Sequence, residues 1–149
     1  MAQLEPPSRL GEMPTWLLSQ AAARAHRLLT GSLAGAGSRG YDYRALAALE
    51  EFGPASQASL GRRTGLDRSD VVATVDDLAA RGYVTRQRDP ADLRRNVIRV
   101  TPGGLSHYRR LDRLLMAVQE ELLAPLTAAE REAFVGMLRR IADAGPSLS

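Results

Sequence analysis

Apolar side chains recur at helical spacing over most of the chain, and polar residues with turn chemistry separate the repeats. The pattern predicts a helix over residues 14–30 and a Gly- and Ser-rich loop over 31–40. A second helix carries Tyr43, Leu46 and Phe52 and ends at Gly53. Six helices and two strands are predicted in all.

The helix from Arg68 to Arg81 has clear end signals. Asp67 is placed to cap its first turn, and Asp70 to reach back as in a capping box. Val71, Val75 and Leu78 line one face of this helix. A shorter helix precedes it across a tight Thr64-Gly65-Leu66 connection, with Ser56 as its cap.

Strand patterns over residues 83–88 and 96–101 flank a polar tip, 89–95. Two short helices followed by a hairpin predict a helix-turn-helix with a wing. The helix that opens at Thr101-Pro102 and the last helix, with a capping box over 127–130, carry long apolar stripes. They have more apolar surface than a small core needs, which favours burial against a second copy of the chain.

The predicted fold is mainly α with a small β-hairpin, a winged helix-turn-helix domain flanked by long dimerisation helices. Its parts are a flexible N-terminus over residues 1–13, an N-terminal dimerisation helix and loop over 14–40, the DNA-binding domain over 41–101 and C-terminal dimerisation helices over 102–144.

Composition excludes several classes of function. There is no cysteine, which rules out thiolate metal sites and a cysteine nucleophile. His26 and His107 lack a metal-binding spacing, and no P-loop, dinucleotide or nucleophile-elbow motif occurs, so we expect neither an enzyme nor a cofactor. Without an apolar run of membrane-spanning length or a signal peptide, we expect a cytoplasmic protein without a membrane partner.

The net charge of +3 is mild, but all 20 basic residues are arginine. Arginine binds phosphate and guanine in a forked geometry, although codon bias in a GC-rich genome would also remove lysine. The distribution of the arginines is more informative, since Arg86, Arg88, Arg94, Arg95 and Arg99 crowd the hairpin. A ribbon with arginines at its tip suits the minor groove, while Asp92 at the base of the turn could hold Arg94 or Arg95 in place.

The exposed half of the 68–81 helix is the candidate for insertion in the major groove. Arg68 could pair with guanine, and Ala73 could pack on a thymine methyl group. Four aspartates favour the alternative of an ordinary amphipathic surface helix, because carboxylates repel phosphates. The residues predicted to contact DNA are Ser56, Gln57, Ser59, Arg62, Arg68, Ser69, Asp70, Ala73, Thr74, Arg86, Arg94 and Arg95.

Aromatic and polar residues on the flanking helices suggest a pocket for a small aromatic or anionic effector. Its candidate lining residues are Trp16, His26, Tyr43 and Tyr108. The alternative is that these are ordinary core or interface residues.

These segments, taken in order, resemble the MarR family of bacterial regulators. The resemblance extends from about Trp16 to Ile141, and its most specific piece is the wing segment from Asp89 to Gly104. It implies a homodimer that binds a pseudo-palindromic operator, usually as a repressor, with Arg94 in the minor groove. It also implies that small phenolic or anionic effectors weaken DNA binding.

Two departures from the family pattern stand out. Leu93 occupies a position where the family often has an arginine, and Asp70, Ala73 and Asp77 replace common Thr and Arg residues. The acidic helix keeps open a second hypothesis, a winged-helix protein–protein interaction module without DNA binding.

Overall fold

The structure is a computed structural model that describes residues 5–145. Its elements in chain order are α1 (Ser8–Gly11), α2 (Pro14–Ala34), α3 (Gly40–Phe52), β1 (Ala55–Ser56), α4 (Gln57–Thr64), α5 (Arg68–Ala80), β2 (Val84–Asp89), β3 (Asp92–Val100), α6 (Pro102–Leu122) and α7 (Ala128–Ala142).

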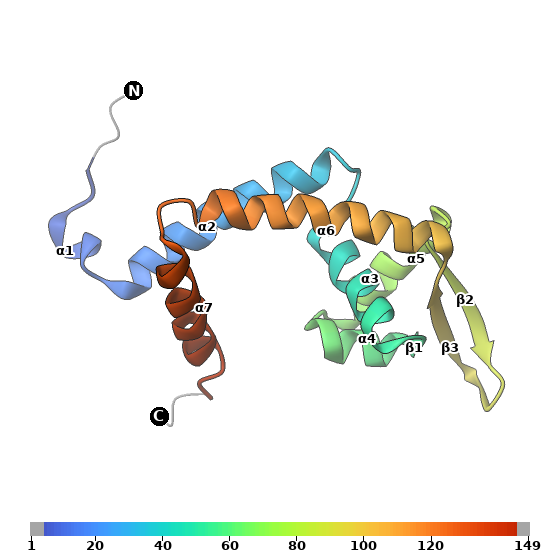
Figure 1. Ribbon diagram of the computed structural model, residues 1–149. Coiled ribbons are helices and arrows are strands. Elements are labelled where there is room, and N and C mark those ends of the chain that lie inside the picture. Colours follow the sequence, from blue (N-terminus) through green and yellow to red (C-terminus); the bar gives the residue numbers. More distant parts are fainter. Residues whose placement is uncertain (1–4, 146–149) are drawn as a thin grey trace.

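The long helices α2 and α6 lie side by side and form a bar, with the smaller elements attached at its two ends (Figure 1). One end carries α3, α4, α5 and the β-hairpin of β2 and β3, and α7 projects from the other. This is the winged helix-turn-helix with long flanking helices that the sequence predicts. None of the described helices is long and apolar enough to cross a membrane.

The core lies where α3, α4 and α5 pack beneath α6. Leu46, Leu78 and Ile98 are fully buried there. The predicted inner face of α5 is confirmed, since Val71, Val75 and Leu78 are all in the core. Burying the apolar faces of several short helices on one another supplies the stability that helices of this length lack alone.

The helix caps follow the sequence closely. The side chains of Ser56, Asp67, Thr101 and Thr127 each accept a hydrogen bond from a backbone amide of the first turn. The predicted capping box at Asp67 is only half formed, however. The Asp70 amide donates to Asp67 at 2.9 Å, but no return bond joins these two described residues. Asp67 instead accepts a second bond from the Ser69 hydroxyl.

The sheet has a third strand that the periodicity does not predict. β1 pairs antiparallel with β3, Ala55 opposite Ile98 and Ser56 opposite Val97, which gives the order β1-β3-β2. A two-residue strand is too short to show alternation. The hairpin strands also extend further into the predicted tip, so that the turn is confined to residues 90 and 91.

One predicted boundary at the N-terminal end was wrong. Helix α2 continues to Ala34 through Gly31, where a loop was expected, because Leu33 is only 2% exposed and its burial outweighs the low helix propensity of glycine. A short helix, α1, also forms inside the segment predicted to be flexible. Residues 1–4 of that segment lie outside the described residues.

Helix α7 has no buried residue. The side chains of Val135, Met137 and Ile141 are 43%, 53% and 60% exposed. Met137 and Ile141 lie four residues apart on one side of the helix, and exposed apolar side chains of this kind are typical of an interface.

Candidate nucleic-acid interface

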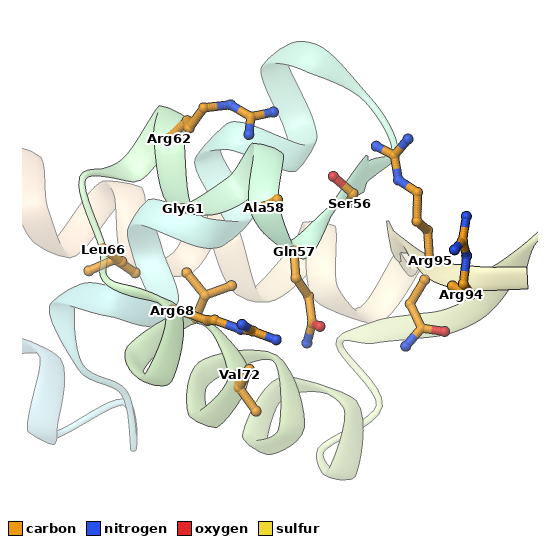
Figure 2. Close-up of a pocket in the computed structure, with 12 residues that line it drawn as sticks. Ser56, Gln57, Ala58, Gly61, Arg62, Leu66, Arg68, Val72, Arg94 and Arg95 are labelled. Carbon is orange, nitrogen blue, oxygen red and sulfur yellow. The ribbon is translucent and has the colours of Figure 1, made fainter. Parts of the chain in front are cut away.

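A groove of about 600 Å³ runs between α4, α5 and the hairpin (Figure 2). Its walls carry the side chains of Arg62, Arg68, Arg94 and Arg95, and we refer to it as the arginine groove. The groove is lined by Ser56, Gln57, Ala58, Gly61, Arg62, Leu66, Arg68, Val71, Val72, Arg94, Arg95 and Asn96. It therefore joins residues from three segments that the sequence analysis selected separately.

Helix α4 supplies the middle of the arginine groove. The Ser59 amide donates to the Ser56 hydroxyl oxygen at 3.1 Å, which caps the helix. One turn later Arg62 Nη2 donates to the Ser59 hydroxyl at 3.3 Å. This contact orients the Arg62 guanidinium along the exposed surface of α4.

Helix α5 exposes the side chains of Arg68, Ser69 and Ala73, as the sequence predicts for a reading face. Thr74 was also predicted to contact DNA, but it does not lie on this exposed face. Thr74 is 1% exposed and points into the core. Val72, which the sequence analysis did not select, is 37% exposed and lines the groove in its place.

The aspartates of α5 are largely engaged within the protein. Asp67 caps the helix, and hydrogen bonds from the Asp70 amide and the Ser69 hydroxyl lower the pKa of its carboxyl group. Asp77 forms an ion pair with Arg81 at 3.2 Å. Asp76 pairs with Arg86 on β2. The two ion pairs offset the charges of Asp76 and Asp77, whereas Asp67 stays ionised as the helix cap.

The ion pair of Asp76 changes the interpretation of Arg86. The sequence analysis placed this arginine among the DNA contacts. In the structure its guanidinium is bound to α5, so it braces the base of the wing against the helix. The side chain of Arg86 is 31% exposed, compared with 92% for Arg94.

The wing tip is held by carboxylates. Asp92 Oδ1 accepts hydrogen bonds from the backbone amide of Arg94 at 3.0 Å and from its Nε at 3.2 Å. The sequence left open whether Arg94 or Arg95 pairs with Asp92, and in the structure the partner is Arg94. Asp89 Oδ1 accepts from the amide of Ala91 at 2.9 Å on the other side of the turn.

A partly buried polar cluster fixes the far end of α5, and we call it the anchor cluster. Arg81, the residue after the last turn, donates to Asp42 at 3.4 Å and to Asp77 at 3.2 Å. Its guanidinium also lies 4.9 Å from the centre of the Tyr83 ring and 3.5 Å from the Ser38 hydroxyl. Asp42 is 1% exposed and accepts a further bond from the Arg39 amide, so α3 and α5 are joined through a carboxylate that sequence reasoning missed.

His107 of α6 completes the anchor cluster. Its Nε2 atom lies 2.7 Å from the Ser38 hydroxyl, and its ring stacks on Tyr83 with centres 4.2 Å apart. Burial, together with the nearby Arg81 cation, lowers the pKa of His107 below its usual range. A neutral imidazole thus occupies the junction of α6 with the winged helix-turn-helix at neutral pH.

A second pocket of about 520 Å³ lies between α2, α3 and α6. It brings together His26 and Tyr43, two of the four residues predicted for an effector pocket. Tyr108 lies behind this wall, stacked on Tyr43 at 5.5 Å. Trp16 is not among the lining residues, since it lies almost three turns before His26 on α2.

Tyr43 is fixed in the wall of this pocket. Its hydroxyl donates to Asp112 Oδ1 at 2.7 Å. Burial and the hydrogen bond to Asp112 raise the pKa of the phenol. The phenol is therefore a neutral polar group in the wall of a cavity that combines apolar side chains with His26 and Arg39.

Comparison with known proteins places this geometry in a family. The sequence model of the MarR family matches residues 38–95. The HTH-type transcriptional regulator YcgE of Bacillus subtilis is 35% identical over 102 residues, which cover 68% of this chain and 66% of that protein. Matches to the curated relatives span between 52% and 66% of their lengths.

Solved structures extend the likeness to the whole fold. The PcaV transcriptional regulator of Streptomyces coelicolor is 33% identical with a TM-score of 0.78, over 88% of this chain and 96% of that one. PcaV has also been solved in complex with its natural ligand. The repressor CouR bound to a 23-mer DNA duplex is 25% identical with a TM-score of 0.84, over 95% and 99%.

A third structure concerns regulation of DNA binding by a small molecule. BpsR of Bordetella bronchiseptica, whose DNA binding is regulated by 6-hydroxynicotinic acid, is 25% identical with a TM-score of 0.83, over 94% and 100%. The helix-turn-helix and the wing lead to the same conclusion as these relatives: the chain belongs to the MarR family of DNA-binding transcriptional regulators.

Proposed function

We propose that the protein is a cytoplasmic repressor that binds a pseudo-palindromic operator as a homodimer. The arginine groove carries this proposal, because four arginines line one groove beside the exposed face of α5. In the proposed complex α5 lies in the major groove and the wing tip in the adjacent minor groove. Arg62, Arg68 and Arg94 then contact DNA, together with the exposed groups of α4 and α5.

Dimerisation is supported by apolar surface that the single chain leaves uncovered. Val135, Met137 and Ile141 of α7 are exposed, as are Leu17 and Leu18 of α2. Helix α7 and the N-terminal part of α2 lie at the end of the bar away from the winged helix-turn-helix (Figure 1). A two-fold dimer formed there would hold two copies of α5 apart, as two half-sites about one helical turn apart require.

The experiment is binding selection from random duplexes, followed by titration of the selected operator at several salt concentrations. Arg94→Ala is expected to weaken binding about tenfold and to reduce the slope of log affinity against log salt by about two, because each protomer loses one cationic contact. Arg99→Ala is the matched control, since Arg99 is an exposed arginine on the same strand but away from the tip.

Failure to select any sequence would contradict the proposal. Negligible, salt-independent DNA affinity together with a co-purifying protein would favour a winged-helix protein–protein interaction module instead. The internal pairing of Asp76 and Asp77 removes much of the motivation for that second function.

We further propose that the pocket between α2, α3 and α6 binds a small aromatic anion that releases the operator. Leu29, Leu33 and Leu115 provide apolar walls, while His26 and Arg39 supply polar and cationic groups. The ligand-dependent DNA binding of BpsR supports the same regulation here.

The probe for this pocket is 6-hydroxynicotinic acid, added to the protein–operator complex in an anisotropy titration. At saturation it is expected to lower operator affinity by roughly fivefold or more. His26→Ala should remove the response, whereas Arg27→Ala, on the next residue of α2 and outside the pocket, should retain it. Unchanged affinity without calorimetric binding of the probe would count against this ligand class.

A further inference from the structure

Leu93 is the most exposed large apolar side chain among residues 5–145, at 65%. It is the first residue after Asp92 at the start of β3 and therefore lies at the tip of the wing. A single exposed leucine is unremarkable on an ordinary surface. This one lies beside Arg94 and Arg95, on a hairpin otherwise rich in charged groups.

The backbone around Leu93 is fixed on both sides. The bonds from Ala91 to Asp89 and from Arg94 to Asp92 close the turn, and a shift in strand register occurs between Arg88 and Asp89. The tip therefore holds Leu93 in an extended position at little further cost in conformational entropy on binding.

An apolar side chain on a rigid, arginine-flanked tip has the features of a minor-groove wedge. Proteins that enter the minor groove combine cations with apolar side chains that press between base pairs and kink the duplex. The cation here is Arg94, whose side chain is 92% exposed. The adjacent apolar group is Leu93.

We propose that Leu93 enters the minor groove beside Arg94 and presses against a base step, bending the operator at each wing. The inference rests on the proposed placement of the wing in the minor groove. It predicts a preference for flexible pyrimidine–purine steps at the two wing positions, because such steps are kinked at low cost. Leu93 thus contributes shape-dependent specificity, while Arg94 contributes charge-dependent affinity.

The test compares the full-length protein with Leu93→Ala and Arg94→Ala on the selected operator. Leu93→Ala is expected to weaken binding about tenfold, since two leucines per dimer lose their burial. The salt slope should not change, because no charge is removed. Fluorescence energy transfer between dyes at the duplex ends should show a smaller bend, and unchanged thermal unfolding would confirm that the exposed substitution leaves the fold intact.

Three outcomes would overturn the wedge. If Leu93→Ala binds and bends DNA like the unchanged protein while Arg94→Ala is weakened, the wing is in the groove but Leu93 is not a wedge. If both variants bind normally, the placement of the wing is itself wrong. If Leu93→Ala reduces the salt slope as Arg94→Ala does, Leu93 acts by positioning the arginine.

Discussion

Gly104→Ala is expected to prevent stable folding of the DNA-binding lobe. A Cβ atom at this position would lie 1.9 Å from the carbonyl oxygen of Tyr83 and 2.8 Å from its carbonyl carbon. Both are backbone atoms, and the same oxygen accepts a hydrogen bond from the Thr101 amide at 3.0 Å. The first turn of α6 must therefore move away from the start of β2, at a cost of about 3 kcal/mol or more in the free energy of unfolding.

Gly103→Ala is the matched control for this substitution. Its Cβ would meet nothing closer than 3.7 Å, so the variant should be as stable as the unchanged protein or slightly more stable. Urea unfolding of both variants at one protein concentration measures the difference. Equal urea midpoints for the two variants would show that the backbone of Tyr83 leaves room for a side chain at position 104.

Asp42→Ala should have the second-largest effect and should also weaken operator binding. The carboxylate is 1% exposed and bonds both the Arg39 amide and Arg81. Its removal costs a helix-terminal hydrogen bond and a buried ion-pair partner, about 2–3 kcal/mol together. Operator affinity should fall as well, since Arg81 fixes the C-terminal end of α5.

Asp77→Ala is the comparison for Asp42→Ala, because Arg81 pairs with both the buried Asp42 and the exposed Asp77. The Asp77 side chain is 47% exposed, so losing its pair with Arg81 should cost less than about 1 kcal/mol. Chemical unfolding and operator titration of the two variants give the comparison. A loss for Asp77→Ala as large as that for Asp42→Ala would mean that the anchor cluster does not depend on burial of Asp42.

The local signals in the sequence predicted the parts of this fold that depend on neighbouring residues. Caps at Ser56 and Asp67 and the inner face of α5 are determined within one or two turns of a helix. Thr74 was predicted to contact DNA, although helical spacing alone would have placed it on the buried face of α5. It lies three residues after Val71 and four before Leu78, in the middle of the apolar stripe.

Contacts between distant segments could not be predicted in this way. Asp42 and Arg81 are separated by 39 positions, and Asp76 and Arg86 lie on different kinds of element. From the sequence alone, each aspartate is expected to be a solvent-exposed charge. Its arginine partner becomes apparent only when α3, α5 and β2 pack together. The sequence therefore overstates how strongly the aspartates of α5 would repel DNA, because two of them are paired with arginines in the structure.

The arginine groove has a consequence for how DNA binding can be controlled. Guanidinium groups are not acetylated as lysine ammonium groups are. The chain contains no lysine at all among its 20 basic residues. Lysine acetylation therefore cannot discharge the groove, and the proposed effector would act on where the groove lies rather than on the charge it carries.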